Sequence, residues 1–187
     1  MLFNSIGFIV FLAIVLIFYY SPIKWVNKKR MLLLASYLFY AMWNPPLILL
    51  LWISTVVDWT VANKLYTLDD ERKRKLWLLL SLVVNLGFLA FFKYGSFLLD
   101  NFISVLNLVG LDFQAAATDI ILPMGISFYT FQTMSYTIDM YYKRNEPAKT
   151  FLDFALYVTF FPQLVAGPIV RSRELIPQFY APKRATV

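Results

Sequence analysis

The chain has 187 residues, of which 60% are hydrophobic and only 15% are charged, whereas a soluble globular domain is nearer half apolar and a quarter charged. The formal net charge is +6, but all 17 Lys and Arg residues fall in clusters between or at the ends of apolar segments. This placement is typical of topology signals and argues against a nucleic-acid-binding face. The absence of histidine and cysteine argues against a zinc site or a disulfide framework within the chain. We therefore expect one membrane domain over residues 1–187.

The first apolar segment, residues 2–20, has no basic n-region and no small-residue cleavage site, so we interpret it as an uncleaved anchor. The basic loop that follows predicts that the segment ends in the cytoplasm and that the N-terminus lies outside. Residues 31–43, 47–62 and 76–92 are further apolar segments, although the first of these is short for a full crossing.

Residues 97–109 are apolar but contain acidic and amide side chains. If this segment crossed the membrane, the acidic loop at 110–119 would be cytoplasmic and the basic loop at 143–149 would be outside. Both placements contradict the positive-inside rule. We therefore expect residues 97–109 to lie in the membrane interface, or to dip in and return.

Residues 121–142 are predicted to cross from outside to inside. They carry a polar stripe at spacings of three, four and three, which places its members on one helix face. The stripe consists of Tyr129, Gln132, Tyr136 and Asp139. Such a face avoids lipid, so these residues are candidates for the wall of a substrate tunnel. The alternative is ordinary hydrogen bonding between membrane helices.

Residues 151–169 are predicted to form a re-entrant segment, because prolines and a glycine interrupt the helix. A re-entrant path returns Arg171 and Arg173 to the cytoplasm. The candidate residues of this loop are Pro162, Gly167, Pro168 and Arg171. Arg171 suits an anionic group such as a phosphate, and the alternative is an arginine that only sets topology.

Three acidic residues elsewhere raise the question of a functional carboxylate. Asp58 lies inside an apolar segment, and we expect a helix cap or an ion pair with Lys64, with a buried functional carboxylate as the alternative. Asp100 and Asp153 are expected to be interfacial and solvated.

The run LPMGISFYTFQTMSYTIDMYY, followed about twenty residues later by FFPQLVAGPIVR, resembles the N-terminal half of the membrane-bound O-acyltransferases. It is most similar to the alginate O-acetylation branch, and the D-alanine transfer protein of teichoic acid is a more distant relative. The resemblance runs over essentially the whole chain. It implies an all-α polytopic membrane protein with about five to six spanning helices plus interfacial or re-entrant segments.

The resemblance also implies a function for the complete protein, which is transfer of acetyl groups to an exported, alginate-like polysaccharide. The implied donor is acetyl-CoA or another acyl donor, with no bound cofactor and no metal. The implied surroundings are membrane lipid in the bacterial inner membrane, a polysaccharide acceptor and an extracytoplasmic acetyltransferase partner.

The essential histidine of this family lies in the C-terminal half, and the present chain has none, so no catalytic residue is assigned here. We therefore expect these residues to be inactive without a histidine-bearing C-terminal half. The alternatives from other classes are a non-catalytic membrane scaffold and a transporter fragment, because polar stripes and broken helices also occur in transporters.

Overall fold

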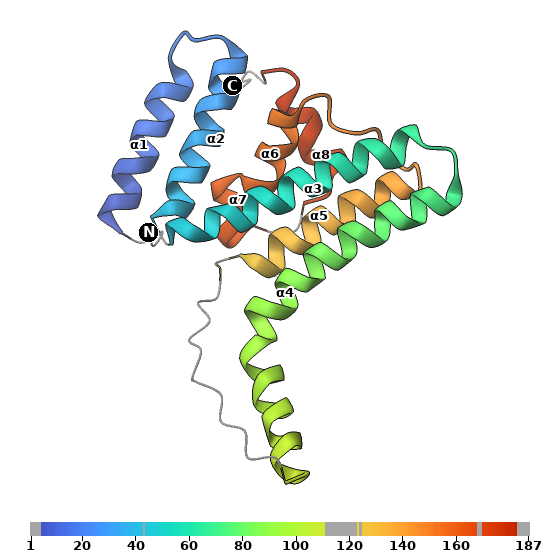
Figure 1. Cartoon of the computed structure of the whole chain (residues 1–187). Helices are drawn as coiled ribbons and strands as arrows, with labels where there is room; N and C mark the ends of the chain where they lie inside the picture. The colour runs from blue at the N-terminus through green and yellow to red at the C-terminus, as the bar shows by residue number, and fades with distance from the viewer. Residues whose placement is uncertain (1–4, 43, 111–122, 124, 168–169, 183–187) are drawn as a thin grey trace.

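The computed structural model describes residues 5–42, 44–110, 123, 125–167 and 170–182, and the regular structure within these ranges is helical (Figure 1). This confirms the predicted all-α class. The elements in chain order are α1 (Ile6–Tyr20), α2 (Trp25–Ala41), η1 (Pro45–Leu47), α3 (Ile48–Thr67), α4 (Glu71–Leu108), α5 (Ile126–Tyr141), α6 (Phe151–Thr159), α7 (Phe161–Ala166), α8 (Ser172–Leu175) and η2 (Ile176–Phe179).

Polar side chains fix the starts of several helices. The Ser5 hydroxyl accepts a hydrogen bond from the backbone N–H of Phe8 and begins α1. The Asp70 carboxylate accepts backbone N–H groups at the start of α4, and the Thr150 hydroxyl accepts the N–H of Asp153 at the start of α6. These caps satisfy donors that the first turn of a helix leaves unpaired.

The helices form two adjoining groups. Helices α3, α4 and α5 run side by side, while α1 packs on α2 and α2 packs on α6 (Figure 1). Helix α6 joins the groups because it also contacts α3 and α5. Its aromatic rings stack against α5, with the Tyr136 and Phe154 centroids 4.6 Å apart. The best-buried part of the molecule therefore surrounds α5 and α6.

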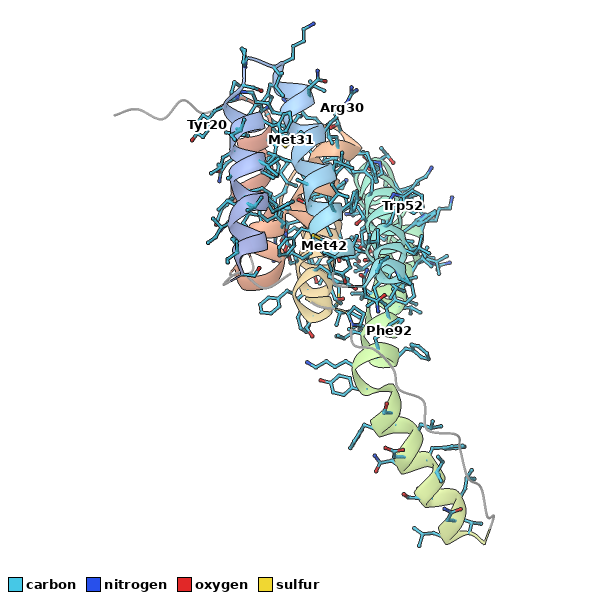
Figure 2. All side chains as sticks on the ribbon, turned by 90° about the vertical axis from the view of Figure 1, so that its left-hand side faces the viewer. Tyr20, Arg30, Met31, Met42, Trp52 and Phe92 are labelled. Atoms are coloured by element: carbon cyan, nitrogen blue, oxygen red, sulfur yellow. The ribbon has the colours of Figure 1, made fainter. Side chains whose placement is uncertain are left out.

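Helix α4 corrects one expectation. The segment 97–109 is not a separate interfacial or re-entrant element, because α4 continues without a break through Lys93 and Gly95 to Leu108. The run contains no proline, and a glycine inside a helix costs only about 1 kcal/mol, so nothing in it stops the helix. The last buried residue of this helix is Leu89, and beyond Phe92 it projects away from the bundle (Figure 2).

Two helices in the described part of the chain are long and apolar enough to cross a membrane by length and composition. They are Pro45–Thr67, which joins η1 to α3, and α4. The helices Ile6–Tyr20 and Phe151–Leu164 are apolar but shorter. Together with the exposed apolar side chains of α1 and α4, these features agree with the predicted membrane protein. The larger number of crossings stays a prediction.

The segment after α6 changes direction and then returns. The backbone of Phe160 leaves the helical region, Pro162 stands in the first turn of α7, and Gly167 caps the end of α7. After α8 and η2 the chain is again beside the start of α6, where the backbone N–H of Lys149 donates to the Tyr180 hydroxyl at 3.3 Å. The chain therefore follows a hairpin-like path, with both ends at the same edge of the bundle.

Candidate functional site

The polar stripe of α5 faces the interior of the bundle. Tyr129, Gln132 and Tyr136 are buried, and Asp139 at the end of the helix is partly exposed. The packing of α5 against α3, α4 and α6 explains this burial. The stripe therefore faces other helices, as its spacing predicted, and its four members do not form one contact surface.

Two stripe residues connect α5 to the segments that follow it. The Gln132 amide donates to the backbone oxygen of Tyr157 at 2.6 Å, and the Gln163 amide donates to the Gln132 side-chain oxygen at 3.3 Å. The Tyr136 hydroxyl accepts the buried backbone N–H of Ala148 at 3.0 Å. These contacts join α5 to other helices and to a loop. They agree with the alternative interpretation of the stripe, which is ordinary hydrogen bonding between membrane helices.

Asp139, in the last turn of α5, pairs with residues of the charged loop that follows this helix. Its carboxylate lies 3.8 Å from the Arg144 guanidinium and accepts from the Asn145 amide at 3.3 Å. A partly exposed ion pair of this kind contributes little to stability. The structure thus separates Asp139 from the other three stripe residues.

Tyr129 differs from its neighbours because its buried hydroxyl has no hydrogen bond of standard geometry. The hydroxyl of Tyr40 on α2 also lacks a hydrogen bond of standard geometry, and the two hydroxyls lie close enough to be each other's hydrogen-bond partner. The buried hydroxyl of Thr130, on the next residue of α5, also lacks a partner. Buried polar groups are nearly always paired, so unpaired hydroxyls indicate a place for water or a ligand.

Asp58 requires a correction. It has no exposed surface, and within the described residues it forms no ion pair with Lys64, which is exposed. Its carboxylate instead accepts from the Ser81 hydroxyl at 2.6 Å and from the Asn85 amide, which is 2.9 Å from both oxygens. The prediction of an ion pair was wrong because the relevant partners come from a different helix.

The Asp58 cluster comprises Ser54 and Asp58 on α3, Ser81 and Asn85 on α4, and Thr133 and Thr137 on α5. Each helix contributes a pair of polar residues spaced by four, so each pair lies on one helix face. The i,i+4 pairs were the signal in the sequence that could have located this cluster. They could not show that three helices bring the pairs together.

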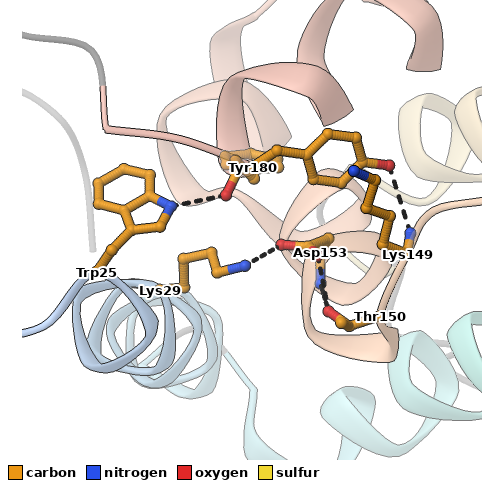
Figure 3. A network of polar contacts seen from close by, with 7 residues as sticks. Trp25, Lys29, Lys149, Thr150, Asp153 and Tyr180 are labelled. Atoms are coloured by element: carbon orange, nitrogen blue, oxygen red, sulfur yellow. Dashed lines mark hydrogen bonds and ion pairs between the residues drawn. The ribbon is translucent and has the colours of Figure 1, made fainter.

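A second buried carboxylate, Asp153, joins α6 to α2 (Figure 3). Lys29 Nζ lies 2.5 Å from its Oδ1, and both side chains are buried, with Lys29 7% and Asp153 1% exposed. The expectation of a solvated Asp153 was therefore wrong, because a cation 124 positions earlier in the chain covers it. Asp100, by contrast, is exposed as expected.

Contacts around this ion pair hold the C-terminal segment in place (Figure 3). The Trp25 indole N–H donates to the backbone oxygen of Phe179 at 2.7 Å, and the Lys149 ammonium lies over the Tyr180 ring at 4.6 Å. Burial raises the pKa of the Tyr180 hydroxyl, which accepts the backbone N–H of Lys149. The network therefore ties α2, α6 and η2 together.

The candidates in the broken-helix segment occupy different positions. Pro162 is exposed at the start of α7, Gly167 ends α7, and Arg171 is exposed directly before α8. Pro168 lies outside the described residues. Arg173, rather than Arg171, lines a polar cavity of about 220 Å³ between the 145–149 loop and η2.

The arrangement of these groups limits their chemistry. The Asp58 carboxylate has no exposed surface and touches protein groups on three helices, so a substrate cannot reach it in this conformation. The Asp153 carboxylate is covered by Lys29. Both therefore position helices. Tyr40 and Tyr129 are buried as well, at 2% and 1% exposed, and their hydroxyls lie beside each other between α2 and α5.

Comparisons with known proteins relate this helical unit to longer membrane enzymes. The chain is 37% identical over 182 residues to the probable alginate O-acetylase AlgI of Pseudomonas aeruginosa, covering 96% of this chain and 34% of that protein. It is 36% identical to the probable alginate O-acetylase AlgI of Azotobacter vinelandii over the same share of this chain. It is 38% identical to the peptidoglycan O-acetyltransferase of Helicobacter pylori over 81% of this chain and 32% of that protein.

This similarity places the chain in the membrane-bound O-acyltransferase family, as the resemblance of its sequence indicated. The chain spans about a third of the length of these curated relatives. No protein-family model matches the sequence. No solved structure matches it either.

Proposed function

We propose that this chain is the N-terminal part of a membrane O-acetyltransferase that acts on an exported polysaccharide. The observation that carries the proposal is the identity to alginate O-acetylases over 96% of the chain. A peptidoglycan O-acetyltransferase matches the same chain at 38% identity. The relatives' names thus share acetyl transfer to a polysaccharide, although the polysaccharides differ.

Tyr129 and Tyr40 form part of the wall that faces the substrates in the complete enzyme. Their buried hydroxyls support this role, because they lie beside each other without a hydrogen bond of standard geometry, and a sugar hydroxyl, an acyl carbonyl or water could complete their hydrogen bonding. Gln132 and Tyr136 hold that wall in place through their contacts with α6 and the loop at 145–149. Asp139 and Arg171 stand at the polar edge of the same unit.

The complete enzyme works across the bacterial inner membrane, with the N-terminus of this chain outside and about five to six crossings in this part. The acyl donor, acetyl-CoA or a related thioester, is cytoplasmic, and an extracytoplasmic acetyltransferase completes delivery to the polysaccharide. A histidine in the C-terminal half acts as the base that removes the proton of the attacking hydroxyl. The 187 residues alone, which contain no histidine, are therefore inactive.

A pair of matched substitutions in the full-length protein tests the role of Tyr129. Tyr129→Phe removes a hydroxyl that makes no hydrogen bond of standard geometry, so we expect nearly unchanged folding but about tenfold less acetyl on the polysaccharide. Tyr136→Phe removes an oxygen that pairs the buried Ala148 N–H, so we expect a loss of stability of about 1–3 kcal/mol. Acetyl content of the polymer and melting temperature in detergent are the two measurements.

Asp139→Asn serves as the variant at the end of the stripe, where only a partly exposed ion pair is lost. Normal acetylation by the Tyr129→Phe variant would show that the polar stripe of α5 has only a structural role. Acetylation of the polymer by the isolated 187 residues, in a strain that lacks the enzyme, would contradict the assignment of the catalytic base to another part of the protein.

A further inference from the structure

A groove runs between α1 and the segment that follows α6, on the side of the molecule away from the Asp58 cluster. Its volume is about 310 Å³. One wall consists of Leu12, Val15, Leu16 and Tyr19, which follow the i, i+3, i+4, i+7 pattern along α1. Phe161 and Phe179 contribute to the opposite wall. The groove is therefore lined mainly by apolar side chains, with Gln178 as a polar member.

One end of the groove is aromatic and cationic. Tyr19 and Trp25 line this end, with ring centroids 6.3 Å apart. The Lys28 ammonium lies 5.4 Å from the Tyr19 ring centroid, so a positive charge stands directly beside the opening. Tyr and Trp side chains favour the level of the lipid headgroups, and lysines in basic loops attract anionic lipids.

Lys29, the residue after Lys28 on α2, does not offer its charge to a ligand in the groove. Lys29 is buried and paired with Asp153, so its charge is already compensated within the protein. Lys28 is only partly buried, and among the described residues its ammonium forms a cation–π contact with Tyr19 and no ion pair with a carboxylate. A ligand that complements the groove therefore has an apolar chain and an anionic end.

We propose that the groove binds one acyl chain of an anionic phospholipid, with the headgroup phosphate beside Lys28. Its volume is at the lower end of ligand-pocket sizes, which suits a single chain. The surrounding α1 surface is strongly exposed and apolar, at Ile6 and Ile17 for example, so lipid reaches the groove from the side. The bound lipid fills the space between α1 and the C-terminal segment.

Photolabelling of the full-length protein in nanodiscs tests the proposal. The discs contain phosphatidylcholine with a small fraction of phosphatidylglycerol that carries a diazirine on one acyl chain, and labelled peptides are identified by mass spectrometry. We expect labels concentrated on Leu12, Leu16 and Leu175, which line the groove. Lys28→Gln should lower this labelling by about fivefold, the effect of one cation near an anionic headgroup.

Two matched controls accompany this experiment. Arg30→Gln removes an equal charge from the opposite face of α2 and should leave the labelling unchanged, while Leu16→Trp fills the groove and should abolish it. Ile17→Trp adds the same side chain to the outward face of α1 and should retain the labelling. Each variant is checked by size-exclusion chromatography and circular dichroism.

Three results would overturn the proposal. The first is equal labelling of the groove and of Ile17, which would indicate ordinary contact with bulk lipid. The second is the same labelling yield for Lys28→Gln and Arg30→Gln. The third is crosslinking of a benzophenone amino acid at position 16 to a part of the full-length protein outside these 187 residues, because a protein segment would then occupy the groove.

Discussion

At the scale of single residues, two buried aspartates illustrate two ways of keeping a carboxylate inside a membrane protein. Asp153 is paired with a cation, Lys29, at 2.5 Å. Asp58 accepts hydrogen bonds from neutral hydroxyl and amide donors on α3 and α4. Removing a partner from either site leaves buried polar groups unpaired, and that penalty exceeds the net gain of the original contact.

Substitution of Asp58 should show that hydrogen bonding holds the Asp58 cluster together. Asp58→Ala leaves Ser81 and Asn85 without their acceptor, so we expect a loss of about 2–3 kcal/mol in the free energy of unfolding. Asp58→Asn retains one acceptor oxygen and should lose less than half as much. Thermal unfolding in detergent measures both, and Asp100→Ala, on the exposed part of α4, is the control. Equal losses for the Ala and Asn variants would contradict this interpretation.

The Lys29–Asp153 pair makes a different prediction, because a charge is left behind when one partner is removed. Lys29→Met should destabilise the protein by about 3–5 kcal/mol, and Lys29→Met with Asp153→Leu should recover most of that loss. Lys73→Met breaks an exposed pair with Asp70 and should change stability by less than about 0.5 kcal/mol. The melting temperatures of the three variants test this prediction. If the double variant is no more stable than Lys29→Met, the loss comes from packing and not from the unpaired charge.

At the scale of elements, the start of α5 is fixed by a close approach to α7. Gly125 has a φ of 72°, and a Cβ added there would lie 2.7 Å from the backbone oxygen of Leu164. A side chain at this position therefore meets both backbone strain and a steric clash with an atom that cannot move freely. This contact positions the Tyr129 turn relative to the broken helix.

Gly125→Ala should consequently destabilise the protein by about 2 kcal/mol or more and reduce acetyl transfer by the full-length enzyme. Gly87 provides the matched control, because it lies inside α4 with nothing within 4 Å of an added Cβ. Gly87→Ala should stabilise the helix by about 0.5–1 kcal/mol. The two glycine variants are compared by thermal unfolding, and similar behaviour would show that the approach of α7 is not constrained at Gly125.

At the scale of the whole molecule, helix length and charge placement bear on how the protein sits in the membrane. By the rise of an α-helix, α4 is about 57 Å long, whereas the hydrocarbon core of a bilayer is about 30 Å thick. Its first turn carries Arg72, Lys73 and Arg74, and the Arg74 guanidinium also hydrogen-bonds the backbone oxygen of Tyr141. The basic end of α4 and the C-terminal end of α5 therefore lie together, on the side predicted to be cytoplasmic.

These 187 residues contain no cysteine, so cysteines introduced one at a time can test this topology, with the protein that lacks the introduced cysteine as the control for background labelling. Ser96→Cys, on the projecting part of α4, should react with a membrane-impermeant maleimide in intact cells. Asn27→Cys and Glu146→Cys, in the basic regions, should react only after permeabilisation. All three positions tolerate a small side chain because they are exposed. The reverse pattern would place the N-terminus in the cytoplasm.

The sequence by itself determined the class of this protein, because composition and the 3.6-residue period depend on local chemistry. It indicated an all-α membrane protein, the buried orientation of Tyr129, Gln132 and Tyr136, and the family to which the chain belongs. It also marked Pro162 and Gly167 as the residues beside which the last long helix is interrupted.

Only the tertiary structure decided which partners the buried polar groups have. Ser81 and Asn85 reach Asp58 from another helix, and Lys29 reaches Asp153 across 124 positions of the chain. Such contacts depend on which helices distant in sequence pack together. Hydrophobic periodicity predicts the buried face of a helix but not its neighbours. The continuity of α4 likewise depended on backbone hydrogen bonds that neither Gly95 nor the charge of Lys93 interrupts.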